Sequence, residues 1–157
     1  MKKYLIVFLI SMVPLIELRG AIPYAVGFGL PIVPSIIVAV IGNMLPVPFI
    51  FLFARRILEW GKDKRYIGPF FTWCLEKGEK GGEKLKAKAG SGLYIALLLF
   101  VGIPLPGTGA WTGTLAASML NLDFRKSVIY VLLGLLLAAA IMLAGSLGLF
   151  GAISFLK

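Results

Sequence analysis

The apolar runs of this 157-residue chain have lengths that do not fit a series of simple membrane spans. Residues 4–16 give roughly 20 Å of helix, which is too short for a hydrocarbon core of roughly 30 Å. Residues 20–54 are too long for one span, and residues 92–120 are interrupted at 102–109 by glycine and proline. Residues 127–156 suit one tilted span. We therefore expect some helices to cross the membrane and others to turn back inside it.

The composition is that of an all-helical integral membrane protein. Apolar residues make up 59% of the chain, and charged residues make up 15%, against roughly 25% in soluble domains. The single cysteine excludes an intrachain disulfide, and the absence of histidine excludes histidine metal sites and histidine-based triads. We expect no metal, no cofactor and no enzyme activity, because no catalytic set of side chains can be recognised.

Two repeats account for the run lengths. In each repeat a re-entrant helical hairpin enters and leaves on one side and the next helix crosses, so the second copy is inverted relative to the first. The glycines of the two Gly-Ala steps, at positions 20 and 109, lie at matching places in the hairpins. The chain is predicted to form a single membrane domain, 1–157. Repeat 1 covers 1–56 and consists of hairpin 4–29, made of half-helices 4–16 and 20–29, followed by span 31–54. An interfacial amphipathic segment covers 55–89, and repeat 2 covers 90–157, with hairpin 92–119, made of half-helices 92–102 and 109–119, followed by span 125–149.

The basic residues predict the orientation in the membrane. Residues 55–88 carry ten Lys or Arg and five acids, interleaved with aromatic residues. A cytoplasmic loop lying on anionic lipid explains this pattern better than nucleic-acid binding does. Both chain ends then lie outside, whereas a rival arrangement of four ordinary spans would put them inside. A homodimer is the expected assembly.

The first hairpin carries the candidate site. Glu17 and Arg19 are ionisable residues in an otherwise apolar stretch, where a charge costs about 3 kcal/mol on insertion scales. One reading is that both lie at the membrane interface and end a short first span. In the other, Arg19 and the N-terminus of half-helix 20–29, beginning at Gly20, form an anion site, and Glu17 carries a proton.

Proline and glycine define where the hairpins break. Pro14 and Pro23 flank the first predicted break, at 17–20, and Pro104, Pro106 and Gly107 make the second. The second tip has no charge. Its candidate substrate-binding residues, which supply hydroxyls and free backbone groups, are Thr108, Gly109 and Thr112.

The motif Pro14-x-x-Glu17-x-Arg19-Gly20-Ala21-x-Pro23, with a second motif from Pro104 to Gly113, resembles the small multi-drug export protein family. That family is similar to the DedA/VTT superfamily, whose fold has two re-entrant hairpins in inverted repeats. The resemblance implies a transporter in a prokaryotic plasma membrane. Some DedA-type members recycle undecaprenyl phosphate. Glu17 and Arg19 match the acidic and basic residues of the first DedA hairpin, whereas Thr108 and Thr112 stand where the second typically carries arginines.

Three functions are compatible with these residues. The first is an ion-coupled transporter or flippase, with the proton as the expected coupling ion, for an amphipathic anion such as a polyprenyl-phosphate carrier lipid. The second is a proton antiporter for lipophilic cations that uses Glu17. The third is a scaffold that does not transport, with the basic loop as its working surface.

Overall fold

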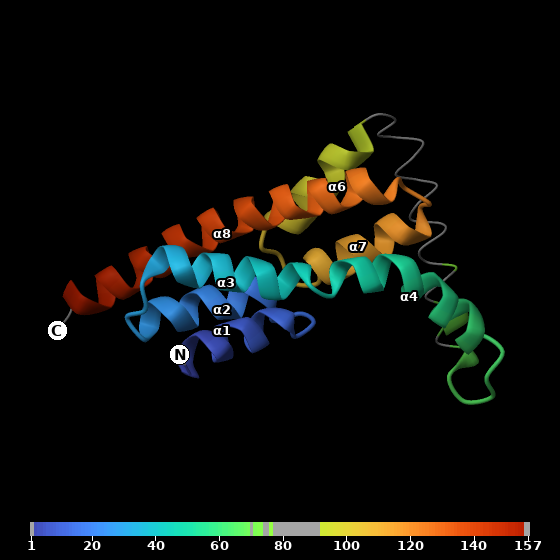
Figure 1. Cartoon of the computed structure of the whole chain (residues 1–157), viewed down its shortest axis with the longest axis horizontal. Helices are drawn as coiled ribbons and strands as arrows, with labels where there is room; N and C mark the ends of the chain where they lie inside the picture. The colour runs from blue at the N-terminus through green and yellow to red at the C-terminus, as the bar shows by residue number, and fades with distance from the viewer. Residues whose placement is uncertain (1, 70, 74–75, 77–91, 156–157) are drawn as a thin grey trace.

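The computed structural model describes residues 2–69, 71–73, 76 and 92–155. The described residues form helices and no strands, so the predicted all-helical class is confirmed. The helices, shown in Figure 1, are α1 (Lys2–Met12), α2 (Glu17–Gly27), α3 (Ile32–Met44), α4 (Val47–Gly61), α6 (Leu93–Gly102), α7 (Ala110–Met119) and α8 (Phe124–Phe155). Of the predicted interfacial segment, residue 70, 74–75 and 77–89 lie outside the described residues.

The first hairpin turns earlier than predicted. α1 ends at Met12 and α2 begins at Glu17, so the break lies at 13–16 and the prediction of 17–20 is wrong. Pro14 ends α1 because a proline disfavours helical conformation in the residue before it. Leu15 and Glu17 have positive φ, at 70° and 50°, which completes the reversal. Pro23, predicted to flank the break, lies inside α2.

Two consecutive helices, α3 and α4, form the first candidate span. Leu45 and Pro46, between α3 and α4, keep helical dihedral angles, so the chain continues without reversing. Residues Ile32–Ala54 are long and apolar enough to cross a membrane, in agreement with the predicted span 31–54. α4 continues beyond this stretch to Gly61.

The second half repeats the order of hairpin and long helix. α6 and α7 are joined by the loop 103–109, where the second break was predicted. Gly107 and Gly109 have φ of +81° and +136°, conformations that residues with a side chain rarely adopt. α8 contains a second stretch that could cross a membrane, Phe124–Leu149, and continues past the predicted end of the span at residue 149. The inverted relation of the two halves stays a prediction.

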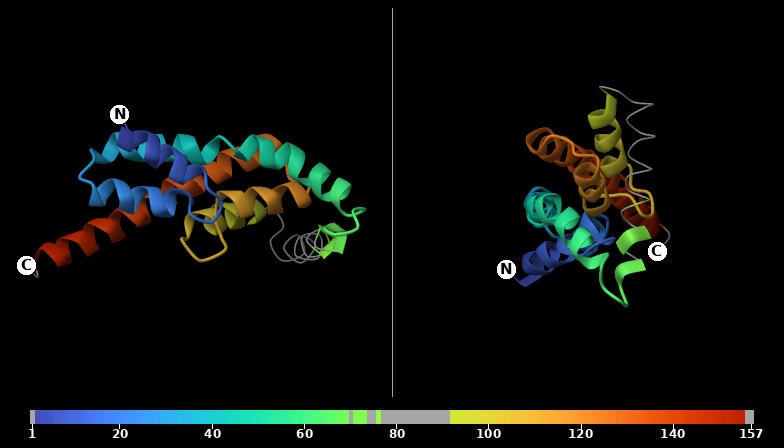
Figure 2. Two further views of the ribbon diagram at one scale, coloured as in Figure 1. Left: turned by 90° about the horizontal axis from the view of Figure 1, so that it is seen from below. Right: turned by 90° about the vertical axis from the view of Figure 1, so that its right-hand side faces the viewer.

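The helices pack through small residues. α8 lies against α2 and α6, α1 lies against α2 and α3, and α4 lies against α7. Buried alanines on α2, α3, α7 and α8 let these backbones approach closely, as is typical of helices packed in a membrane. The start of α1 and the end of α8 lie at one end of the molecule, and residues 62–69, which follow α4, lie at the other (Figures 1 and 2).

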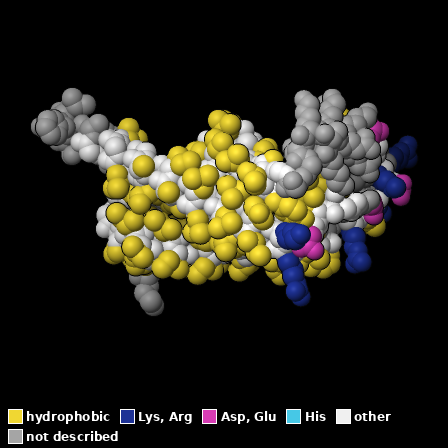
Figure 3. Space-filling view, turned by 90° about the horizontal axis from the view of Figure 1, so that it is seen from above, with side chains coloured by type: hydrophobic (Ala, Val, Ile, Leu, Met, Phe, Trp, Pro, Cys, Tyr) yellow, Lys and Arg dark blue, Asp and Glu magenta, His cyan; other side chains and the backbone are white. Residues whose placement is uncertain are grey.

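The surface divides into an apolar body and a charged end. Exposed leucine, isoleucine, valine and phenylalanine side chains lie on α1, α3, α4, α6 and α8. Figure 3 shows hydrophobic side chains over the body of the molecule and the basic and acidic ones gathered at one end. An apolar surface of this extent matches a lipid environment.

Candidate functional site: two hairpin tips joined by charge

Glu17 caps a helix that belongs to the other hairpin. The backbone N–H groups of Ala110 and Trp111, in the first turn of α7, donate to Glu17 Oε2 and Oε1, each at 3.1 Å. The first N–H groups of a helix have no acceptor within the helix, and the dipole at this end favours a negative charge. Glu17 is only 3% exposed. Its carboxylate therefore supplies, from the first hairpin, the cap that α7 does not obtain from its own neighbours.

Gly109 makes this approach possible. A β-carbon built on Gly109 would stand 2.5 Å from Glu17 Oε2 and 2.8 Å from its Cδ and Oε1. The φ of +136° at Gly109 also disfavours any residue with a side chain. The sequence prediction placed Gly109 in substrate binding, and the structure places it directly behind the carboxylate of Glu17.

Arg19 also joins the two hairpin tips, but as a positively charged hydrogen-bond donor, whereas Glu17 is a negatively charged acceptor. Its guanidinium donates to the Leu105 carbonyl, to Thr108 Oγ1 at 2.6 Å and to the Ile103 carbonyl at 3.5 Å. The Thr108 hydroxyl lies 2.8 Å from the Leu105 carbonyl and 3.0 Å from that of Ile103, so it can donate to either while it accepts from Arg19. Both charges of the first hairpin are thus held by the second.

The prolines of the second loop explain why it accepts a cation. Pro104 and Pro106 have no N–H group, so the loop offers more carbonyl acceptors than donors. Two of these carbonyls, together with Thr108, face the fork of donors on Arg19, which suits several acceptors at once. Arg19 is expected from the sequence to lie beside the N-terminus of half-helix 20–29, but α2 begins at Glu17, and the helix N-terminus that is engaged is that of α7.

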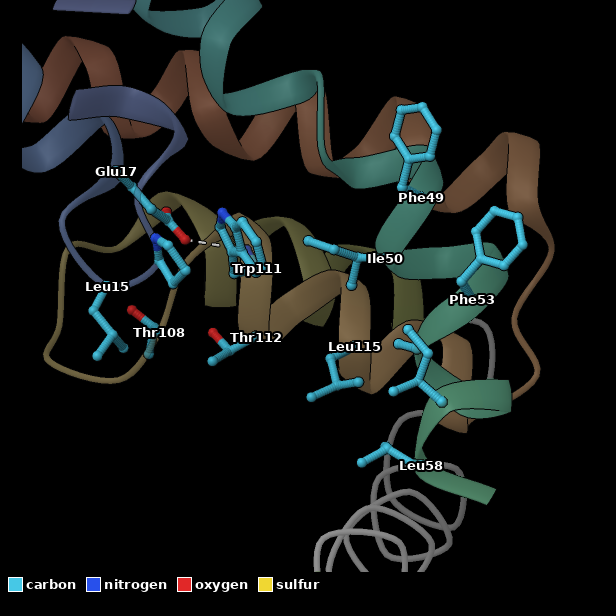
Figure 4. A pocket seen from close by; sticks show the side chains of 13 residues that line it. Leu15, Glu17, Phe49, Ile50, Phe53, Leu58, Thr108, Trp111, Thr112 and Leu115 are labelled. Carbon is cyan, nitrogen blue, oxygen red and sulfur yellow. Dashed lines mark hydrogen bonds between the residues drawn. The ribbon is translucent and has the colours of Figure 1, made fainter. Parts of the chain in front are cut away.

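An apolar groove of about 620 Å³ opens beside the joined tips. It runs between α4 and α7, and Glu17 lies at one end (Figure 4). Glu17 is the single charged residue among the described residues that line it. The lining residues are Pro14, Leu15, Glu17, Phe49, Ile50, Phe53, Ala54, Ile57, Leu58, Thr108, Trp111, Thr112 and Leu115.

The groove separates the predicted site residues into two groups. Thr108 and Thr112 line it together with Glu17, whereas Arg19, Gly20 and Gly109 are not among its lining residues. Sequence reasoning missed the wall formed by α4. No local signal marks this wall, because Phe49, Ile50 and Phe53, which α4 presents to the groove, are apolar like the residues around them.

Trp111 connects the groove to the tip. Its backbone N–H holds Glu17, and its indole ring lines the groove (Figure 4). The indole Nε1 is buried and has no hydrogen-bond partner within the described part of the chain. A ligand in the groove would therefore contact the residue whose backbone holds the carboxylate.

The comparisons with known proteins agree with a membrane transporter. No curated protein and no solved structure matches the chain. One family model matches residues 17–141, which include Glu17, Arg19 and the loop 103–109 that receives them. Since this match covers most of the sequence, the chain belongs to the family described as "Putative small multi-drug export protein".

Proposed function

We propose that the protein is a proton-coupled exporter of lipophilic cations, the second of the three functions compatible with its sequence. The supporting observation is the position of Glu17, a buried acid at the end of an apolar groove whose described lining includes no basic side chain. The family name, which describes small export proteins for drugs, is consistent with this substrate class.

Burying a charge in an apolar groove is costly. A cation that leaves water for an apolar groove loses its hydration and needs a negative partner there. Glu17 can provide that charge, while aromatic side chains such as Phe49, Phe53 and Trp111 offer favourable contacts to a lipophilic cation. An anionic head group in the same place would instead meet the carboxylate, because Arg19 is turned to the loop 103–109.

Exchange follows if the proton and the cation compete for Glu17. Protonation removes the negative charge, and with it the partner that a bound cation requires and most of the attraction to the α7 N-terminus. When Glu17 loses its proton, the negative charge and its attraction to the α7 N-terminus return, and a cation can bind. Because neither species binds well in the presence of the other, inward movement of protons can drive outward movement of the cation.

A polyprenyl-phosphate carrier lipid is the second candidate cargo. It is favoured by the Ala110 and Trp111 N–H groups, which already hold one oxyanion and suit a phosphate equally well. In that case the head group would replace Glu17 at α7, and the groove would receive part of the tail.

Ligand-dependent thermal stability of the purified protein separates the two cargoes. Tetraphenylphosphonium should raise the melting temperature of the wild type and leave Glu17→Gln unaffected, since ligand binding to the folded state stabilises it. The control Glu59→Gln removes an exposed acid of α4 that does not line the groove, and it should respond like the wild type. Stabilisation by undecaprenyl phosphate, without any by tetraphenylphosphonium, would identify the lipid as the cargo and contradict the proposed export of cations.

A further inference from the structure

Asn43, at the end of α3, is the least satisfied polar side chain among the described residues. It is 0% exposed, and neither Oδ1 nor Nδ2 has a hydrogen-bond partner within the described part of the protein. The backbone beside it is also short of donors. Pro46 and Pro48 have no N–H, so the carbonyls of Gly42 and Met44 lack the donor four residues ahead that an uninterrupted helix would give them.

Helix geometry places Asn43 at the depth of the hairpin tips. Ser118 Oγ donates to the Phe51 carbonyl at 2.7 Å, and α4 and α7 run in the same direction from tip to charged end (Figures 1 and 2). Asn43 precedes Phe51 by eight residues across the α3–α4 junction, where the backbone keeps helical dihedral angles, and Ala110 precedes Ser118 by eight residues on α7. Eight helical residues rise about 12 Å. Asn43 therefore lies level with Ala110, whose N–H holds Glu17.

One further contact and two buried polar atoms support this location. A β-carbon on Gly42 would lie 2.2 Å from Ser11 Oγ, close to the end of α1 and the loop that leads into Glu17. On α7, Trp111 Nε1 and Thr114 Oγ1 are buried without partners, and they lie within the first two turns after the tip. Unsatisfied donors and acceptors thus gather at one level of the molecule.

The chemistry of this set favours water over a metal cation. The Gly42 and Met44 carbonyls and Asn43 Oδ1 are acceptors, whereas Asn43 Nδ2 is a donor. Water can serve both kinds, and a buried water typically makes two to four such bonds. A sodium ion would face Asn43 Nδ2 with its positive charge and leave this donor unsatisfied.

We propose that the α3–α4 junction binds internal water and that Asn43 positions this water to carry protons to Glu17. This proposal rests on the proposed proton-coupled function. The charged group nearest Glu17 in the sequence is Arg19, which faces the loop 103–109, and the described lining of the groove from α4 and α7 adds no other charge. No charged side chain among these can therefore pass a proton to Glu17, and water held beside Asn43 would serve as the carrier.

Replacement of Asn43 tests the proposal. Asn43→Leu removes the water's partners, so proton-driven exchange in proteoliposomes should slow by about tenfold or more, while the equilibrium Kd for tetraphenylphosphonium stays within about twofold. Asn43→Ser keeps a polar group and should restore most of the rate. Ser35→Ala is the control, because Ser35 is equally buried on α3 but its hydroxyl is satisfied by the Pro31 carbonyl.

Several outcomes are decisive. Wild-type exchange rates in Asn43→Leu, or equal losses in the leucine and serine variants, would overturn the water proposal. Should Asn43→Leu fail to fold, a solvent deuterium isotope effect that is the same in Asn43→Ser and in the wild type would also count against it, because a rearranged water path should change that effect. A wild type that neither binds tetraphenylphosphonium nor moves protons would instead overturn the proposed function.

Discussion

Gly109 and Glu17, from different hairpins, lie so close together that a β-carbon on the glycine would stand 2.5 Å from the carboxylate of the acid. This contact places a negative charge against the first turn of α7. With Arg19 held by the opposite loop, it makes the two tips one unit. Movement of either hairpin therefore has to break bonds made by these two charged side chains.

Gly109→Ala should destabilise the protein by about 1–3 kcal/mol, because the new methyl group displaces Glu17 and the backbone is strained. Gly107→Ala separates these causes. Gly107 also has positive φ, but nothing lies within 4 Å of a β-carbon there. In chemical unfolding, Gly109→Ala should be the more damaging variant, and its cost should shrink when Glu17→Ala is added. Strictly additive costs would show that the two residues do not interact.

Arg19→Leu should lower the free energy of unfolding by about 1–3 kcal/mol, because it leaves the Leu105 and Ile103 carbonyls and Thr108 without their charged donor. Arg19→Lys keeps the charge but cannot present a planar fork, so an intermediate loss is expected. Denaturant titration provides the measurement. Stability equal to wild type in Arg19→Leu would mean that the tips are not held together by this residue.

Replacement by alanine should affect the stability of the protein differently at Gly42 and at Gly145. At Gly42 the methyl group would lie 2.7 Å from the Phe8 carbonyl and 2.2 Å from Ser11 Oγ, so α1 and α3 would be forced apart. At Gly145, on α8, nothing lies within 4 Å, and alanine should stabilise the helix by up to about 1 kcal/mol. Melting temperatures should fall for the first variant and hold or rise for the second. The reverse order would contradict the packing of α1 on α3.

Leu115→Trp should narrow the groove and discriminate between cargoes by size. Affinity for a bulky cation such as tetraphenylphosphonium should fall about tenfold or more, while that for tetramethylammonium should change much less. Leu99→Trp is the control, because Leu99 is exposed on α6 and does not line the groove. If Leu115→Trp and Leu99→Trp bound each cation with the same affinity, cargo would not enter between α4 and α7.

The sequence was most informative about the breaks and least informative about their partners. Gly107 and Pro104 located the second loop correctly because each has a strong local conformational preference. The first break was misplaced because Glu17, a charged residue, was assigned to the loop, whereas it begins α2. Its partners are backbone N–H groups 93 and 94 residues away. Backbone donors carry no side-chain signal, so no local pattern could reveal this pairing.

The same limit applies to the groove. The candidate residues Thr108 and Thr112 were identified because hydroxyls are unusual in an apolar segment, and both line it. The apolar wall from α4 could not be distinguished by composition from the lipid-facing residues around it. Only the packing of α4 against α7 separates the two.

Proton release on cation binding is the most direct test of the central claim that the two species compete for Glu17. Purified protein in weakly buffered detergent solution would be titrated with tetraphenylphosphonium at a series of starting pH values and followed with a pH-sensitive dye. Competition for Glu17 should acidify the solution with wild type and with Glu59→Gln, and should leave its pH unchanged with Glu17→Gln. Cation binding without proton release, or release that persists in Glu17→Gln, would contradict it.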